Sequence, residues 1–287
     1  MTDSVFVSDG RRFVPTEHAR GPWDPQALHG GAPAALITAA FERMEPGAEL
    51  RIGRLGFEFL RPIPLAPLTL STRIVRAGRR VQELAGELRA DRGVAGEELV
   101  CRASALRVLE VPADLPAVGV PIPGAPPEGG PASPREEAAA PPAQTRLPPP
   151  ESGKGVRFAL DGSNDASFAA SAMEMRWLGD PRALGPGRVW MRLRHPLLPG
   201  EPLTPLARLA ATADFGNGVS ATLPFDRFLF INADLTVHLH RQPRGEWIGL
   251  DAHTLLHAGG MGMAESVLHD SDGPLGRAFQ TLVVQPR

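Results

Sequence analysis

Apolar residues at every second position mark a group of short strands near the end of the chain. Leu235, Val237 and Leu239 alternate with polar residues, which is the period of a strand with one buried and one exposed face. The same reasoning predicts four strands in succession, over residues 234–240, 247–256, 262–268 and 275–284. Because the turns between them are short, these strands indicate an antiparallel sheet.

The same pattern occurs a second time, earlier in the chain. Without a gap, Leu235 aligns with Leu55 and Val237 with Phe57. After an insertion of about five residues in the first copy, the match resumes at Arg277. The first copy is thereby predicted to hold strands over residues 54–60, 68–75, 81–90 and 98–109. We conclude that the chain is a tandem repeat of one domain type.

An apolar helix is predicted ahead of the strands in each copy. His29, Gly30 and Gly31 open the first helix, over residues 32–44, which is apolar nearly all round. The second spans residues 203–215, with Thr204 as its N-cap, Pro205 at its first position and Gly216-Asn217-Gly218 as its end. A helix that is apolar on all sides is buried, so each copy is predicted to be a sheet wrapped around one central helix.

Proline separates the two copies. Thirteen of the 31 prolines lie in residues 111–150, together with much alanine and glycine and few large apolar residues. This composition is typical of an extended or disordered linker. We therefore predict a first domain over residues 1–110, a linker over 111–155 and a second domain over 156–287.

Composition and missing motifs exclude several classes of protein. The formal net charge of −2 gives no basic field for nucleic acid, and a single cysteine, Cys101, excludes an internal disulfide. No apolar run reaches the ~18 residues that span a bilayer, and the N-terminus lacks a signal-peptide pattern, so we expect a cytoplasmic enzyme or binding protein. Nucleophile elbows, P-loops and dinucleotide-binding glycine motifs are absent as well. His238 and His240 share a strand face but lack a third ligand at a clear spacing, so we expect no metal there.

Three polar residues distinguish the second copy from the first. The aligned pairs are Asp234 with Arg54, Thr254 with Ile74, and Gln280 with Ala105. A duplicated fold keeps its core pattern for packing, whereas it needs only one working site. All three side chains can hydrogen-bond a water molecule, so we expect the working site in the second copy.

These features resemble the double-hotdog acyl-CoA thioesterases of the acyl-CoA thioesterase II type. The matching stretches are His29–Gly31 with its helix, Gly56–Pro62, Asp234–Arg241 and Gly273–Gln280. The resemblance covers both predicted domains but not residues 111–150. It implies an α+β tandem hotdog fold, assembly into a homo-oligomer, and hydrolysis of acyl-CoA to the free acid and CoA without metal or organic cofactor.

The resemblance also implies a catalytic trio. In that family an Asp, a Ser or Thr, and a Gln of the second domain hold the hydrolytic water, and the matching residues here are Asp234, Thr254 and Gln280. Thr236 is an alternative source of the hydroxyl, because it follows Asp234 on the same strand face.

The chemistry of a thioesterase assigns a role to each of these groups. Asp234 would be the general base, and Gln280 and Thr254 would orient the water. The helix N-terminus at His29-Gly30-Gly31 would bind the oxyanion, so that one site joins both copies. Arg79 and Arg80 can meet the phosphates of CoA.

Two other functions stay open on the same fold. One is a non-catalytic acyl-CoA binding protein, which would need no general base. The other is a hydratase or dehydratase, although the Asp-x-Asn-Pro-x-His pattern of hotdog hydratases is missing.

Overall fold

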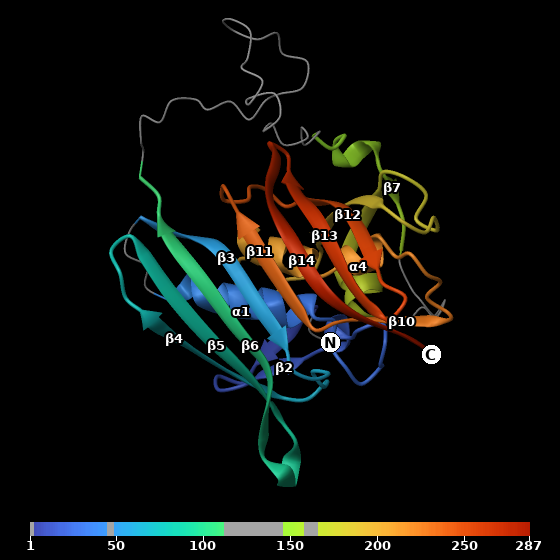
Figure 1. The fold of residues 1–287 in the computed structure, drawn as a ribbon. Coiled ribbons are helices and arrows are strands. Elements are labelled where there is room, and N and C mark those ends of the chain that lie inside the picture. The colour runs from blue at the N-terminus through green and yellow to red at the C-terminus, as the bar shows by residue number, and fades with distance from the viewer. Residues whose placement is uncertain (1–2, 45–48, 112–145, 158–165) are drawn as a thin grey trace, which may run out of the picture.

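The structure, a computed structural model, describes residues 3–44, 49–111, 146–157 and 166–287. These residues form one 14-stranded sheet, in which neighbouring strands run antiparallel and β10 pairs with β14 beside the main path (Figure 1). In chain order the strands are β1 (Phe6–Ser8), β2 (Phe13–Pro15), β3 (Leu50–Phe59), β4 (Leu68–Arg76), β5 (Val81–Asp91), β6 (Glu97–Leu109), β7 (Lys154–Gly155), β8 (Met173–Trp177), β9 (Gly187–Leu193), β10 (Phe228–Asn232), β11 (Asp234–Leu239), β12 (Ile248–Leu256), β13 (Met261–Asp270) and β14 (Gly273–Pro286). The predicted strands are thus present.

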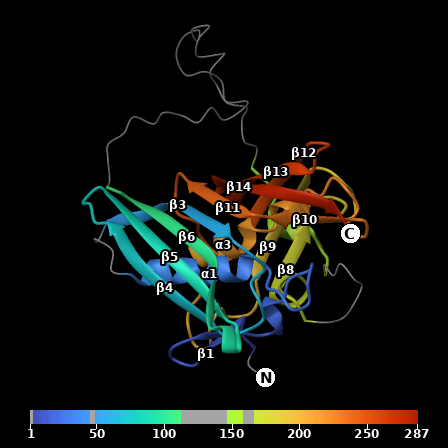
Figure 2. The same ribbon diagram turned by 60° about the horizontal axis from the view of Figure 1, so that its bottom comes forward.

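The two long helices lie against the inner face of this curved sheet (Figure 2), and the remaining helical elements are short. The helical elements are α1 (Gly31–Arg43), α3 (Pro205–Ala213), the short α4 (Gly216–Val219), the single turns η1 (Glu17–Ala19), η2 (Gly93–Ala95) and η3 (Pro150–Ser152), and the π-helical turn η4 (Phe168–Ala172). The hydroxyl of Thr204 accepts a hydrogen bond from Ala207 N (3.1 Å), so the predicted N-cap of the second helix is confirmed. Each copy is a sheet around a buried helix, as predicted.

The two long helices pack against each other in antiparallel directions. Gly31, at the start of α1, lies against the Ala211 carbonyl near the end of α3. Near the other end of α1, the hydroxyl of Thr204 donates to the Glu42 carboxylate (2.5 Å). This packing brings the N-terminus of α1 next to the C-terminal end of α3.

The two copies meet along β3 and β11, and their pairing confirms the alignment of the repeat. Thr236 pairs with Gly56, Leu235 with Phe57, and Val237 with Leu55, so the two strands are related by an approximate two-fold axis at Thr236 and Gly56. Gly56 pairs with Ser104, and its counterpart Thr236 pairs with Phe279, so Ser104 and Phe279 are counterparts as well. The residues that follow them, Ala105 and Gln280, are then counterparts too, as the sequence alignment predicts.

Two parts of the chain differ from the sequence prediction or lie outside it. Gly216-Asn217-Gly218 do not end the helical segment, because they form α4 directly after α3. Residues 112–145 lie outside the described residues, so the linker and the domain boundaries stay a prediction. Residues 146–155, predicted as the end of that linker, contain η3 and β7, and Leu147 is buried.

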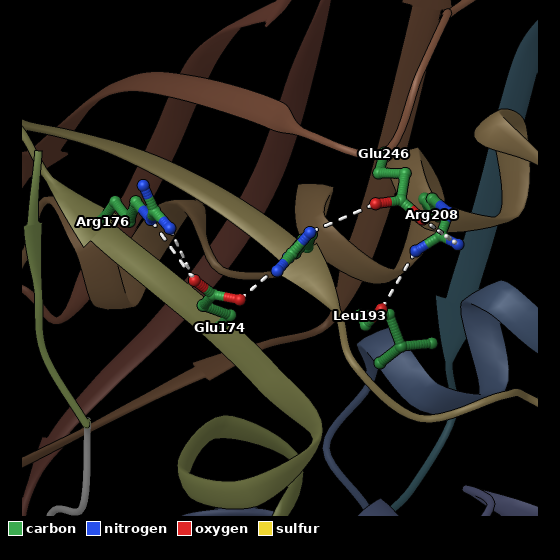
Figure 3. Close-up of polar contacts among 6 residues, drawn as sticks. Glu174, Arg176, Leu193, Arg208 and Glu246 are labelled. Carbon is green, nitrogen blue, oxygen red and sulfur yellow. Dashed lines mark hydrogen bonds and ion pairs between the residues drawn. The ribbon is translucent and has the colours of Figure 1, made fainter. Parts of the chain in front are cut away.

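A polar network ties α3 to the far end of the sheet (Figure 3). Glu174 accepts hydrogen bonds from Arg176 on the same strand and from Arg192 on β9 (2.8 Å). Arg192 also reaches Glu246, which accepts from Arg208 of α3 (3.4 Å). Burial alone would raise the pKa of Glu174, but the hydrogen bonds from Arg192 and Arg176 outweigh it and lower that pKa.

Among the helices of the described residues, none has both the length and the apolar composition to cross a membrane.

Candidate functional site

A cavity of about 480 Å³ lies where the two copies meet. Its wall is largely apolar and aromatic, with Trp23, Phe59, Phe225, Leu229 and Ile231 among the lining residues. A group of polar side chains also lines it, comprising His29, Asp214, Asn217 and Asn232. An apolar cavity with a few converging polar groups is the usual form of a small-molecule site.

Asp214 is the centre of the polar group. It follows α3 directly, is only 3% exposed, and still lines the cavity. Its Oδ1 accepts a hydrogen bond from Nδ2 of Asn232 (2.7 Å), and its Oδ2 lies 3.0 Å from Nδ1 of His29. A nearly buried carboxylate that faces a cavity and is held by such donors is a candidate general base.

Gln280 lies behind Asp214 and holds it in place. The side-chain amide of Gln280 donates to the backbone carbonyl of Asp214 (3.0 Å) and, over a longer distance, to its Oδ1 (3.4 Å). Its oxygen accepts from the backbone N–H of Asn217 (2.9 Å). Gln280 is 2% exposed and does not line the cavity. The prediction that Gln280 orients the hydrolytic water stays a prediction, and the contacts of its side chain here are to Asp214 and Asn217.

The start of α1 approaches Asp214 from the first copy. A Cβ atom on Gly30 would lie 2.8 Å from Oδ2 of Asp214, so only glycine permits this approach. His29 stacks on Phe215 with ring centroids 4.2 Å apart. Its Nδ1 also lies 3.0 Å from the Gly31 N–H. Because one nitrogen cannot both donate to Asp214 and accept from Gly31, these two contacts require different tautomers. The helix N-terminus of copy one thus meets Asp214 of copy two, and not the predicted trio of Asp234, Thr254 and Gln280.

Thr254 is close to this group but not in it. It is 7% exposed, and its hydroxyl is 2.7 Å from the hydroxyl of Ser220, which donates to Gly216 O. Thr254 does not line the cavity. Its contacts therefore place it behind α4, where it supports the short helix.

Asp234 is not brought to the site, which corrects the sequence prediction. In β11, Leu235 and Val237 are buried, and Asp234 and Thr236 alternate with them on the outer face of the sheet. The carboxylate of Asp234 accepts a hydrogen bond from the backbone N–H of Thr281 (2.6 Å). Thr236 pairs with Gly56 on the same outer face, so it does not supply the hydroxyl either.

Arg79 and Arg80 also lie away from the cavity. Both are exposed in the turn between β4 and β5, and Arg80 O accepts from Leu109 N at the end of β6. The cavity is lined by the other end of β3, around Phe59. His238 and His240 have exposed side chains, and neither belongs to a group of three metal-ligating residues in the described parts of the chain.

Three residues of the group, Asp214, Asn217 and Asn232, were not predicted as site residues from the sequence. One signal for Asp214 was present: it is the only acidic residue in the apolar segment 203–215. A buried charge in an otherwise apolar helix usually has a partner or a function. Asn232 ends β10 and carries no comparable signal.

Comparisons with known proteins agree with this architecture. A family model described as the N-terminal domain of acyl-CoA thioesterase matches residues 19–108. A second, described as the C-terminal domain of acyl-CoA thioesterase, matches residues 135–284. No curated protein matches the chain significantly.

Solved structures with similar folds cover nearly the whole chain. A conserved protein of unknown function with a hot dog fold from Alicyclobacillus acidocaldarius is 18% identical with a TM-score of 0.65, over 98% of this chain and 95% of its own. The tesB protein of Mycobacterium avium subsp. paratuberculosis is 16% identical with a TM-score of 0.60, over 98% and 96%. An acyl-CoA thioesterase II, TesB2, from Mycobacterium marinum is 16% identical with a TM-score of 0.59, over 92% of each chain. The predicted tandem hotdog fold is confirmed.

Proposed function

Because this chain belongs to the acyl-CoA thioesterase family, we propose that it hydrolyses acyl-CoA thioesters with Asp214 as the general base. The observation that carries the proposal is the position of the Asp214 carboxylate. It faces a cavity between the two copies and is held by Asn232 of its own copy and His29 of the other. No metal or organic cofactor is needed for this chemistry.

The reaction begins with a water molecule between Asp214 and the thioester. Asp214 takes a proton from this water while the water oxygen attacks the carbonyl carbon. The tetrahedral intermediate then breaks its C–S bond, and the protonated Asp214 returns the proton to the thiolate. The products are the free acid and CoA. Gln280 acts as a positioning residue, because it contacts Asp214 and not the cavity.

The start of α1 stabilises the oxyanion that forms on the carbonyl oxygen. Within the part of the chain that the structure describes, the Gly30 N–H has no hydrogen-bond acceptor. Gly30 lines the cavity beside Asp214, at the positive end of a 13-residue helix. A free N–H at a helix N-terminus is a favourable oxyanion donor, both by its hydrogen bond and by the helix dipole.

The apolar part of the cavity receives the acyl chain. Trp23, Phe225 and Phe230 form an aromatic cluster, with centroids 5.8 Å apart for Trp23 and Phe225 and 5.7 Å apart for Phe225 and Phe230. Trp23 and Phe225 line the cavity, together with Leu229 and Ile231. Such a wall favours hydrocarbon over charged acyl groups.

The test compares two Asp→Asn variants in a thiol-release assay with short-, medium- and long-chain acyl-CoAs. Asp214→Asn is expected to lower kcat by about 10²–10⁴-fold, the contribution of a general base. Asp234→Asn is the matched control, since it makes the same chemical change on the outer face of the sheet. It is expected to keep wild-type turnover. Circular dichroism and thermal unfolding establish that both variants fold.

Other outcomes would assign other functions. Loss of turnover in Asp234→Asn with full activity in Asp214→Asn would overturn the assignment of the base. No thiol release by the wild type from any acyl-CoA, with a rise in Tm on binding, would favour the binding protein. Loss of the absorbance of an unsaturated acyl-CoA without thiol release would favour a hydratase. Assembly into a homo-oligomer and a cytoplasmic location are further expectations for this family.

A further inference from the structure

We propose that Asp3, His18 and His195, which lie beside Ser171 of η4, bind one divalent transition-metal ion. Zinc is the ion that best suits two imidazoles and a carboxylate. The site differs from the proposed catalytic centre in position and in residues, and the proposal does not depend on thioester hydrolysis.

Three ligand atoms from distant parts of the chain converge here. One donor atom from each residue lies within 4.8 Å of the other two, and this is the one group of at least three metal-ligating residues in the described parts of the chain. Nδ1 of His195 is 2.8 Å from Oδ1 of Asp3, and Nε2 of His18 is 3.9 Å from the same oxygen. The histidine side chains are mostly buried, whereas Asp3 is 82% exposed and free to adjust.

Hydrogen bonding around Ser171 determines the tautomer of His18. The Ser171 hydroxyl donates its only proton to Ser167 O (2.8 Å). In that arrangement the hydroxyl accepts from Nδ1 of His18, which lies 2.8 Å away. The proton of the neutral His18 ring is thus on Nδ1, and Nε2 presents a lone pair. A hydrogen bond from the non-ligating nitrogen to a fixed acceptor is the usual support of a metal-bound histidine.

The lone pair of His18 faces a negatively charged neighbour, and this arrangement calls for a cation. Nε2 of His18 and the Asp3 carboxylate are then both hydrogen-bond acceptors, so they cannot hydrogen-bond each other. A metal ion supplies the missing positive charge without protonating the ring.

The two rings must leave their stacked arrangement to bind one ion, because the lone pair of a ring nitrogen lies in the plane of its ring. They stack with centroids 4.2 Å apart and planes inclined by 20°. Rotation of the His195 ring about its Cβ–Cγ bond would take it out of the stack. The space for this rotation is present, because His195 and Ser171 line a second cavity of about 580 Å³.

A metal in this position would join three segments of the fold. His18 belongs to η1, His195 follows β9, and Asp3 precedes the segment whose Val5 and Phe6 N–H groups donate to Pro196 O and Leu197 O. It would also fix η4 through Ser171. The metal therefore acts as a clamp between the two copies, and we expect it to raise stability.

The experiment titrates the metal-free full chain, after treatment with EDTA and dialysis, with ZnCl₂ in a calorimeter. Binding of one zinc ion per chain and a zinc-dependent rise in Tm are expected. His18→Gln and His195→Gln should each weaken binding by more than about tenfold, and Ser171→Ala by about 10–100-fold through loss of the supporting hydrogen bond. His257→Gln is the matched control, because His257 is exposed in the turn between β12 and β13. It should bind zinc as the wild type does.

Cobalt gives an independent readout, since Co²⁺ bound by imidazole and carboxylate absorbs in the visible range. The absorption should appear in the wild type and in His257→Gln and be absent from His195→Gln. The proposal is overturned if the folded wild type binds no stoichiometric zinc, or if His18→Gln, His195→Gln and Ser171→Ala bind it as tightly as the wild type. Ser171→Ala removes one hydroxyl only, so it keeps the test decisive if a histidine variant does not fold.

Discussion

Gly216 and Gln280 are in such close contact that no side chain fits between them. A Cβ atom on Gly216 would lie 2.8 Å from Oε1 of Gln280 and 2.6 Å from the hydroxyl of Ser266. Gly216 is thus needed for close packing of α4 on β13 and β14, whereas the sequence pattern indicated the end of a helix. We predict that Gly216→Ala displaces Gln280 and loosens its hold on Asp214. Turnover should fall, and the free energy of unfolding should drop by about 1–3 kcal/mol.

Gly218 offers the matched control for this variant. It lies in the same short helix, and a Cβ atom there would meet no atom within 4 Å. Gly218→Ala should therefore leave the free energy of unfolding, measured in urea, near that of the wild type. Equal stability of the two alanine variants would contradict the packing argument.

The relation between Asp234 and Gln280 shows which part of the site the sequence could predict. Alternation of buried and exposed residues predicts the strands, and the repeat correctly aligns Gln280 with Ala105. The same alternation assigns Asp234 to the face opposite its buried neighbour Leu235. Gln280, between the buried Ala278 and Leu282, is on the core face. The alternation of apolar positions alone is therefore enough to put the two residues on opposite faces.

The approach of His29 to Asp214 could not be predicted in this way. It depends on the pairing of β3 with β11, which sets the start of α1 against the end of α3. That pairing joins two copies that are far apart in sequence, and no local pattern of hydrophobic residues specifies it. The sequence predicts that the N-terminus of α1 belongs to the site, but its partner Asp214 follows only from the tertiary structure.

A buried ion pair in the last turn should contribute to stability. Asp270 has a fully buried side chain and accepts two hydrogen bonds from Arg241, each 2.6 Å long. Its oxygens also accept from the backbone N–H groups of Arg244 and Asp272. We predict that Asp270→Asn lowers the free energy of unfolding by about 1–3 kcal/mol, the cost of losing charged hydrogen bonds to a buried carboxylate. Asp272→Asn, at an exposed pair with Arg244, should change it by less than about 0.5 kcal/mol.

The same carboxylate should make the free energy of unfolding depend on pH. Burial by itself would raise the pKa of Asp270, but the hydrogen bonds from Arg241 and the two backbone groups outweigh it and lower that pKa. A lowered pKa in the folded state stabilises the fold above the ordinary pKa of about 4, and this contribution is lost as the pH falls further. Urea unfolding between pH 5 and pH 2, values on either side of that pKa, should show a steeper loss for the wild type than for Asp270→Asn.

His269 should produce a second loss of stability at a higher pH. It is 1% exposed, and its Nδ1 has no hydrogen-bond partner within the described residues. Burial lowers its pKa from 6.5 to about 4, against a weaker opposite effect of Asp270. The unfolded chain therefore binds a proton that the folded chain does not, and stability decreases by about 3 kcal/mol as the pH falls from about 6.5 to 4.

The variant His269→Leu removes the titrating group while keeping the site apolar. The slope of the unfolding free energy against pH should become flatter between pH 6.5 and 4, the ordinary and the folded pKa of His269. His257→Gln, at an exposed histidine, should keep the wild-type slope. A wild-type slope in His269→Leu would show that His269 is not the group responsible.

Cys101 should not react with thiol reagents in the folded protein. It is the only cysteine, it is fully buried, and burial raises the pKa of its thiol to about 12, with Glu58 and Asp214 adding to the shift. Since the thiolate is the reactive form, an aromatic disulfide reagent should titrate less than one thiol per native chain over the course of an assay, and one after denaturation. Removing the Asp214 charge in Asp214→Asn leaves the larger effect of burial, so this variant should be as unreactive as the wild type. Thiol release by either protein then measures CoA alone; rapid labelling of native Cys101 would contradict its burial between β3 and β5.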